Sequence, residues 1–137
     1  MGWEVFYYQT ERGESPIEDF LNFLPRKAKA KCVAYMDLLE EMGFNLPRSV
    51  IAKVRGDIWE LRPEWSGTEY RFLYFAMIGQ RFVILHALTK KRQKLRPADI
   101  ELAEARMADV QRRVEDEGTS PIRQRTDQEG SPVRKRP

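Results

Sequence analysis

Cysteine and histidine are scarce in this chain of 137 residues, which contains one of each, Cys32 and His86. A single cysteine excludes a disulfide within the chain, and the two residues together cannot supply the nitrogen and sulfur ligands of a zinc site. We therefore expect no metal and no cofactor. A lone cysteine is also typical of proteins in the reducing cytoplasm, where we expect this one to act.

Long apolar runs are absent as well. No run approaches the roughly 20 residues that span a bilayer. The first residues, Met1–Glu4, lack the basic region and the apolar stretch of a secretory signal peptide. These absences predict a protein that has no membrane partner.

Charge is abundant but nearly balanced, with 24 basic and 21 acidic residues and a net charge of +3. The balance fails locally, because eleven basic residues stand against four acidic ones between Arg48 and Arg96. A positive field of this size indicates a polyanionic ligand such as a nucleic acid. A solvated charged surface without a ligand is the alternative.

Helix and strand patterns follow one another along the chain. The run Ser15-Pro16-Ile17-Glu18 is a helix start, with a capping serine, a proline at the first helical position and a glutamate that closes the capping box. A second helix is expected from Arg26 to Met42, with Cys32 as a core residue on its apolar stripe. Strands are predicted at 3–8, 51–55, 58–62, 70–78 and 81–88, and a last helix begins near Pro97.

This order of elements predicts an α+β domain. A small, mostly antiparallel sheet should carry an N-terminal helical hairpin on one face, followed by a C-terminal helix, while the other face stays open. We place this domain at residues 1–113. In residues 114–137 the apolar content collapses in favour of Gly, Ser, Pro and charged residues, so we expect a disordered, charged tail.

Strand alternation gathers cations on the expected open face. In strand 58–62, Glu60 and Arg62 point away from Trp59 and Leu61, and Arg71 from the next strand is expected on their face. More basic residues approach from the hairpin and from the end of the last strand: Lys53, Arg55, Lys90, Lys91 and Lys94. Cations bind phosphates and aromatic faces stack on unpaired bases, so the cluster predicts an RNA interface.

RNA needs little chemistry from a protein that cuts it, because its own 2′-hydroxyl is the nucleophile. The chain has no nucleophile motif and no carboxylate pair at a plausible spacing. Arg71 or Arg62 can stabilise the charge that develops on the phosphate. A lysine crowded by other cations, such as Lys90 or Lys91, can exchange the protons.

Each candidate also has a purely structural interpretation. Arg62 can pair with Glu60 or Glu64, and the lysines can form a solvated loop. His86 is a conventional acid or base, but alternation places it with the apolar side chains of Phe82, Ile84 and Leu88, as in a partly buried structural histidine. A tyrosine such as Tyr74 is more often core than catalyst.

Three ordered runs resemble the phage-derived, HigB-like branch of the RelE toxin superfamily: Lys53–Arg62 with Trp-Glu-Leu-Arg, Tyr70–Tyr74 with Tyr-Arg-x-x-Tyr, and Val83–Lys91 with a Lys-Lys end. The resemblance extends over residues 3–113. It implies a RelE-like fold and the toxin of a type II toxin–antitoxin system, which cuts mRNA on the ribosome, without metal, by attack of the 2′-hydroxyl on the adjacent phosphate. It also implies an antitoxin partner, with a helix-turn-helix, that covers the basic face.

Site residues follow from the same resemblance. Arg71 matches the central-strand arginine that contacts the scissile phosphate, and Lys91, with Lys90, matches the basic position that ends the last strand. Tyr74 and His86 match positions that recur in the motif and join Arg62 as catalytic candidates. The residues expected to bind RNA are Lys53, Arg55, Arg62, Arg71, Lys90, Lys91 and Lys94.

Two other functions fit the same fold. A ParE-like toxin would inhibit DNA gyrase instead of cutting RNA, although such an inhibitor does not require the basic residues. An inactive phage-derived binding protein would do neither.

Overall fold

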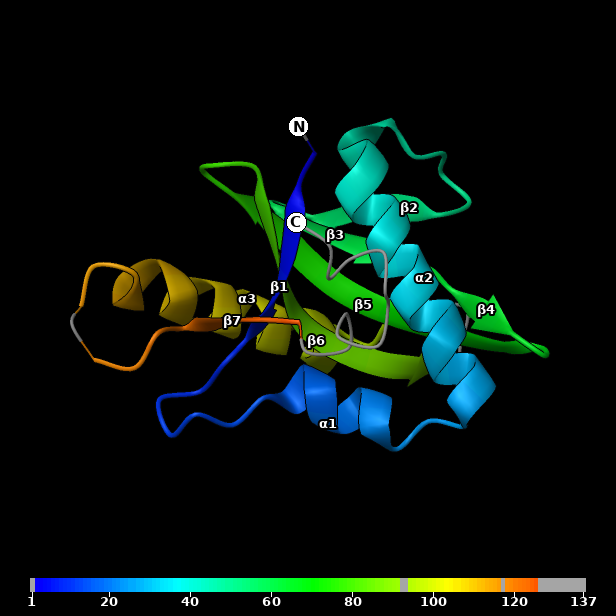
Figure 1. The fold of residues 1–137 in the computed structure, drawn as a ribbon, viewed down its shortest axis with the longest axis horizontal. Helices are drawn as coiled ribbons and strands as arrows, with labels where there is room; N and C mark the ends of the chain where they lie inside the picture. Colours follow the sequence, from blue (N-terminus) through cyan, green and yellow to red (C-terminus); the bar gives the residue numbers. More distant parts are fainter. Residues whose placement is uncertain (1, 92–93, 117, 126–137) are drawn as a thin grey trace, which may run out of the picture.

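Seven strands form one sheet in the computed structural model, which describes residues 2–91, 94–116 and 118–125 (Figure 1). In chain order the elements are β1 (Glu4–Tyr8), α1 (Pro16–Asn22), α2 (Arg26–Met42), the short 3-10 helix η1 (Gly43–Asn45), β2 (Ile51–Arg55), β3 (Ile58–Leu61), β4 (Glu64–Trp65), β5 (Thr68–Met77), β6 (Arg81–Lys90), α3 (Pro97–Arg113) and β7 (Ile122–Gln124). The α+β class predicted from the order of elements is confirmed.

The sheet is mixed. Its strand order is β2-β3-β5-β6-β1-β7, and the short β4 pairs with β5 beside this path. The pairs β2–β3, β3–β5, β5–β6 and β1–β7 are antiparallel, whereas β1 runs parallel to β6. The parallel pair arises because β1 and β6 are joined by a long crossover and not by a hairpin. The crossover contains α1, α2 and the strands β2 to β5.

The two N-terminal helices cover one face of the sheet. The Ser15 hydroxyl accepts a hydrogen bond from the Glu18 amide at 3.4 Å, and Pro16 occupies the first helical position, as the sequence predicts. Each helix buries its apolar side against the sheet, α1 through Ile17 and Leu21, α2 chiefly through Cys32 and Met36. The expected helical hairpin is not seen, since α1 and α2 run in different directions across the sheet (Figure 1).

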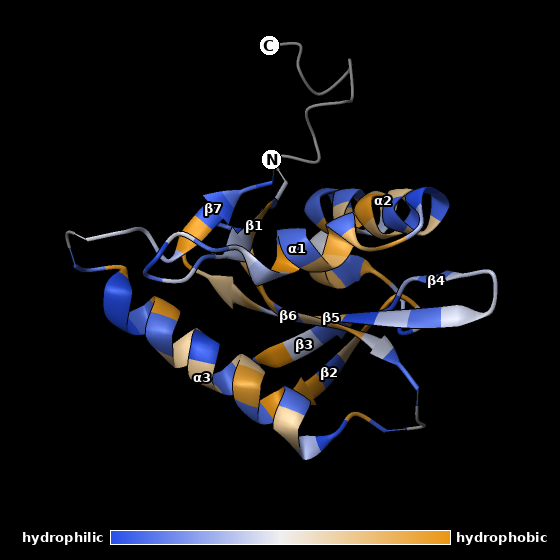
Figure 2. Cartoon of the chain, turned by 90° about the horizontal axis from the view of Figure 1, so that it is seen from below, coloured by the Kyte–Doolittle hydropathy of each residue, from blue (hydrophilic) through white to orange (hydrophobic). Residues whose placement is uncertain are grey.

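The other face of the sheet is not open along its whole length, because α3 packs across it (Figure 2). A second core forms there between Leu73, Phe75 and Val83 of the sheet and Ala103 and Val110 of α3. The expectation of an uncovered face is therefore corrected, and exposed sheet remains only where α3 does not reach. Within the described residues, no helix is both long and apolar enough to cross a membrane.

A β-bulge in β6 changes which face its second half presents. Leu73 of β5 lies opposite His86, but the next residue, Tyr74, lies opposite Ile84, so Leu85 is an extra residue in the register. Leu85 packs on the α3 side, and the bulge turns His86 to that side as well. Strict alternation predicts that His86 shares a face with Phe82 and Ile84. This prediction is wrong, because the bulge places His86 on the opposite face.

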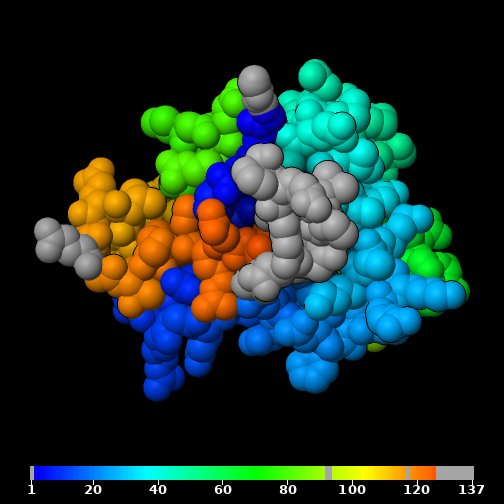
Figure 3. All heavy atoms as spheres, in the orientation of Figure 1, coloured from blue at the N-terminus to red at the C-terminus, as the bar shows by residue number. Residues whose placement is uncertain are grey.

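Part of the segment expected to be a disordered tail belongs to the fold. Residues Ile122–Gln124 form β7, which pairs with β1 at the edge of the sheet and lies on the surface beside the N-terminal residues (Figure 3). Three arginines hold this segment: Arg113 donates to the Thr119 carbonyl, Arg123 pairs with Glu18, and the fully buried Arg125 pairs with Asp37 and Glu40. Ion pairs and backbone pairing thus replace the apolar contacts that the composition lacks. Residues 126–137 lie outside the described part of the chain.

Candidate functional site

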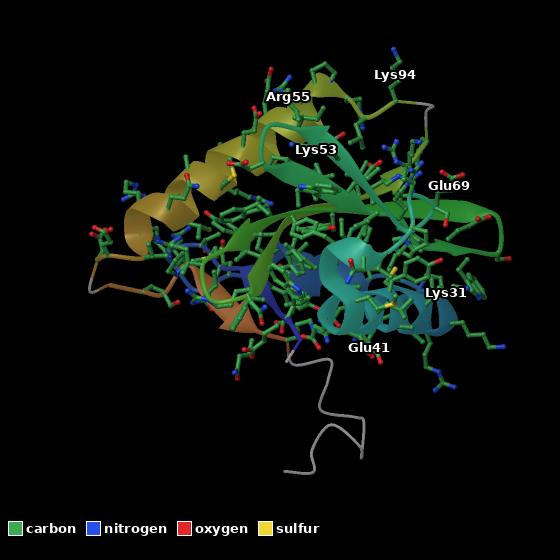
Figure 4. All side chains as sticks on the ribbon, turned by 90° about the horizontal axis from the view of Figure 1, so that it is seen from above. Lys31, Glu41, Lys53, Arg55, Glu69 and Lys94 are labelled. Atoms are coloured by element: carbon green, nitrogen blue, oxygen red, sulfur yellow. The ribbon has the colours of Figure 1, made fainter. Side chains whose placement is uncertain are left out.

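Two adjoining hollows lie at the end of the sheet where β5 begins and β6 ends. The larger, of about 680 Å³, is lined by Arg62, Gly67, Thr68, Glu69, Thr89, Lys90 and Lys91. The smaller, of about 120 Å³, shares Thr89, Lys90 and Lys91 and adds the loop into α3, with Lys94, Arg96 and Asp99. Together they form what we call the basic groove. Glu69 and Lys94 mark its two sides in Figure 4.

Arg71 does not line this groove, because its side chain is only 4% exposed, but it pairs with Glu69, which lines the larger hollow. Its Nη1 donates to the Tyr70 carbonyl at 2.8 Å, and its Nη2 donates to Oε1 of Glu69 at 2.9 Å. Its Nε lies 3.5 Å from Oε1 of Glu60 and has no hydrogen-bond partner among the described residues. The guanidinium is therefore held in one orientation between two carboxylates, and one of its donors is left unpaired.

Glu60 is the carboxylate shared by the two arginines of the site. It is 13% exposed, and its second oxygen lies 3.7 Å from Nε of Arg62. Arg62 in turn donates from Nη1 to the Arg48 carbonyl at 3.1 Å. The prediction that Glu60, Arg62 and Arg71 share a face is confirmed. Sequence reasoning counted Glu60 only as a surface partner of Arg62 and missed its contact with Arg71, although alternation placed it there.

His86 meets Asp99 on the α3 side of the sheet. Its Nε2 lies 2.8 Å from Oδ1 of Asp99, and both side chains are largely buried. Asp99 stands in the first turn of α3 and also lines the smaller hollow, with Arg96 3.9 Å away. This partner was not found from the sequence, because the bulge that turns His86 toward α3 leaves no signal in the pattern of residues.

Three of the expected site residues lie elsewhere. Lys53 lies over the Trp59 ring, 6.0 Å from its centroid, on the face opposite Arg71. Arg55 forms two hydrogen bonds with Glu104 of α3, at 2.8 and 3.0 Å, and this pairing raises the pKa of Arg55 (Figure 4). Tyr74 is fully buried in the core beneath α1 and α2. The basic groove is therefore lined by Arg62, Lys90, Lys91, Lys94 and Arg96, with Arg71 paired to its Glu69, and not by these three.

Burial makes two nucleophilic side chains, Cys32 and Tyr74, unreactive. Burial raises the pKa of the Cys32 thiol to about 12, and the thiol is fully enclosed by the core, as expected for a core residue. Burial also raises the pKa of Tyr74, whose hydroxyl has no hydrogen-bond partner among the described residues.

Within the described residues, no group of three or more His, Cys, Asp or Glu side chains could hold a metal ion. The site thus offers cations, carboxylates and one histidine.

Comparison with known proteins identifies the family. The model of the family described as "Phage derived protein Gp49-like (DUF891)" matches residues 19–108, which include β2 to β6 and most of α3. All residues of the basic groove fall within this span. No protein of curated function matches the chain. Because the family model matches more than half of its residues, the chain belongs to the Gp49-like family of phage-derived proteins.

Proposed function

We propose that this protein is the toxin of a type II toxin–antitoxin system, and that it cuts mRNA. The Gp49-like family is related to the RelE and ParE toxins, and we assign the chain to the RelE side, near HigB. The observation that carries the assignment is the ion pair between Arg71 and Glu69, which lines the groove together with Arg62, Lys90 and Lys91. A DNA-gyrase inhibitor would not need this arrangement.

The groove fits the backbone of a single RNA strand. Five of its lining residues in the described chain carry a positive charge and can each approach a phosphate: Arg62, Lys90, Lys91, Lys94 and Arg96. The groove is open and shallow, which suits an unpaired strand more than an isolated small molecule. We therefore propose single-stranded mRNA, held on the ribosome, as the substrate.

The proposed reaction is transfer of a phosphoryl group within the RNA. The 2′-oxygen forms a bond to the adjacent phosphorus and loses its proton, the bond from phosphorus to the 5′-oxygen breaks, and that oxygen takes up a proton. Arg71 would stabilise the charge that develops on the phosphate oxygens. Glu60, 3.5 Å from the Arg71 guanidinium, is the proposed proton acceptor.

The proton for the leaving oxygen has two possible sources at this site. The first source is His86, whose Nε2 contacts Asp99. The second source is the pair of lysines at the end of β6, Lys90 and Lys91. Tyr74 has no part in the proposal, because it is buried on the opposite face. We propose no metal and no cofactor for this reaction.

An antitoxin completes the proposed system. A free ribonuclease would stop the growth of its own cell, so a partner must cover the groove until it is removed. We propose a small protein with a helix-turn-helix, whose acidic residues meet Lys90, Lys91 and Lys94. The toxin would act in the cytoplasm, where mRNA is translated.

Primer extension on cellular mRNA after induction of the protein tests this function. We expect new 5′ ends within coding sequences, in register with codons, and an arrest of growth. The double variant Arg71→Ala with Lys91→Ala should abolish both. Because Arg71 is buried, a second variant, Lys90→Ala with Lys91→Ala, changes only side chains at the groove and should strongly reduce cleavage without loss of fold.

The matched control is the double variant Arg26→Ala with Lys31→Ala, which also removes two positive charges. Both side chains are exposed on the outer surface of α2. This control should cut mRNA as the wild type does. If wild-type induction leaves mRNA intact, or if both groove variants cut normally, the proposed function is wrong. Intact mRNA together with blocked gyrase would favour a ParE-like inhibitor.

A further inference from the structure

A separate hollow of about 300 Å³ lies at the β2 edge of the sheet, where the chain passes from α2 into β2. We call it the aromatic pocket, and it is lined by Phe44, Leu46, Arg48, Ile51, Ala52, Lys53 and Trp59. We propose that this pocket binds an unpaired base of the RNA. The proposal rests on the proposed function and adds a second contact to the same substrate, outside the basic groove.

Two aromatic rings give the pocket faces on which a base can stack. The centroids of Phe44 and Trp59 lie 5.0 Å apart with their planes at 58°, and Phe44 is 42% exposed. Trp3 and Phe82 also pack against Phe44 in edge-to-face contacts, at 5.5 and 5.3 Å between centroids. Both rings are therefore in place before a ligand arrives, so that stacking costs little side-chain entropy.

The backbone turn that presents Phe44 requires a glycine. Gly43 has a φ of 55°, and a Cβ on it would lie 2.4 Å from the indole nitrogen of Trp3. Only glycine can adopt this conformation while the backbone passes so close to the Trp3 ring. The local sequence thus fixes an exposed aromatic ring at the mouth of the pocket.

The charges of the pocket match a nucleotide. Arg48 and Lys53 line it, and no carboxylate is among the described residues that do. The Lys53 ammonium lies over the Trp59 ring, 6.0 Å from its centroid. A base that stacks on this ring takes the place of the ammonium, which can then contact the phosphate of the same nucleotide. A peptide strand at this edge would also find apolar contacts, but the two cations favour a ligand that carries phosphates.

The aromatic pocket and the basic groove are joined through two arginines. Arg62 lines the groove, and its Nη1 donates to the carbonyl of Arg48, which lines the pocket, at 3.1 Å. The two sites therefore lie on either side of the end of β3. A strand of RNA that crosses this sheet edge can place a phosphate in the groove and a neighbouring base in the pocket.

Binding of a short single-stranded RNA to the full chain tests the proposal. The probe is an oligonucleotide with 2′-O-methyl groups, which cannot be cut, and its affinity is read by fluorescence anisotropy. Lys53→Glu and Phe44→Ala should each weaken binding about tenfold, the size expected for loss of one stacked base or its phosphate contact. Lys31→Glu, an equal change of charge on an exposed residue of α2, should have little effect.

Cleavage of an unmodified mRNA on translating ribosomes separates the two proposals. We expect Lys53→Glu to raise KM about tenfold and to leave kcat unchanged, because Lys53 lies away from Arg71. If the wild type binds and cuts RNA but Lys53→Glu and Phe44→Ala match it, the pocket proposal is wrong and the proposed function stands. Loss of antitoxin binding alone in these variants would make the pocket a protein-docking site and would also overturn the proposal. If the wild type neither binds nor cuts RNA, both proposals fail.

Discussion

Arg71 and Glu69 form an ion pair of 2.9 Å between a guanidinium that is 4% exposed and a carboxylate that is 49% exposed. The arginine cannot leave its place, because the Tyr70 carbonyl and Glu60 also hold it. Glu69 can rotate into solvent. In the proposed function, a phosphate of the RNA replaces the Glu69 carboxylate on Nη2, so that this glutamate occupies the anion site when the substrate is absent.

Glu69→Gln should therefore strengthen RNA binding. Removing the charge weakens the contact of residue 69 with Nη2 of Arg71 without disturbing Glu60, so we expect the KM for RNA cleavage to fall about threefold. The measurement is the rate at which the purified protein cuts mRNA on translating ribosomes, against the concentration of these ribosome–mRNA complexes. Glu41→Gln, at an exposed position on α2, removes an equal charge far from the groove and should leave KM unchanged (Figure 4). An unchanged or raised KM in Glu69→Gln would show that the carboxylate does not compete with substrate.

Asp99→Asn should lower the turnover of the proposed reaction. An amide cannot stabilise the imidazolium form of His86 as a carboxylate does, so we expect kcat to fall about tenfold while KM stays constant. The dependence of kcat on pH should change in the same variant, which a purely structural role of Asp99 would not produce. If kcat depends on pH in Asp99→Asn as it does in the wild type, then Lys90 or Lys91, and not His86, supplies the proton to the leaving oxygen.

Arg125→Ala should destabilise the whole domain. The Arg125 side chain is fully buried, and its Nη2 lies 2.8 Å from Asp37 and 3.2 Å from Glu40. Its loss removes two ion pairs from the fold, and we expect the free energy of unfolding to fall by about 2–3 kcal/mol, below the full cost of a buried pair because Asp37 is partly exposed. Chemical denaturation measures this. Arg26→Ala, an exposed arginine on α2, should change the free energy of unfolding little, and an equal loss in both variants would contradict the structural role of the C-terminal segment.

Asp109 should make stability depend on acid pH. Burial raises the pKa of this carboxyl, but hydrogen bonds from Tyr8 and Arg113 outweigh it and hold the pKa below its usual range. A lowered folded-state pKa stabilises the fold above the unfolded pKa of about 3.9, and this stabilisation is lost as the pH falls through the folded value. We expect Asp109→Asn to cost about 1–2 kcal/mol at neutral pH and less below pH 4.

Urea denaturation at a series of pH values tests the role of Asp109. Asp116→Asn, at an exposed position, serves as the control and should follow the wild type throughout. If Asp109→Asn loses the same free energy of unfolding at pH 2 as at pH 7, its contribution comes from packing and not from its charge.

Local patterns account for much of what the sequence predicts. The second helix begins and ends at the expected residues, Arg26 and Met42, and the strand Ile51–Arg55 is also as expected. Alternation places Glu60 and Arg62 on one face with Arg71, and their ion pairs confirm it. These features depend on the spacing of neighbouring residues, which the chain itself specifies.

The partners of these residues depend on contacts between distant segments. A single extra residue, Leu85, turns His86 toward Asp99, thirteen positions away, and no spacing rule signals a bulge. Likewise β7 forms because three arginines find acceptors across the fold, although its own composition predicts disorder. By itself, therefore, the sequence determined most of the helices and strands, the faces of the regular strands and the local excess of cations. Only the tertiary structure decided which cations share a groove, because the covering by α3, the bulge and the ion pairs arise when remote parts of the chain pack together.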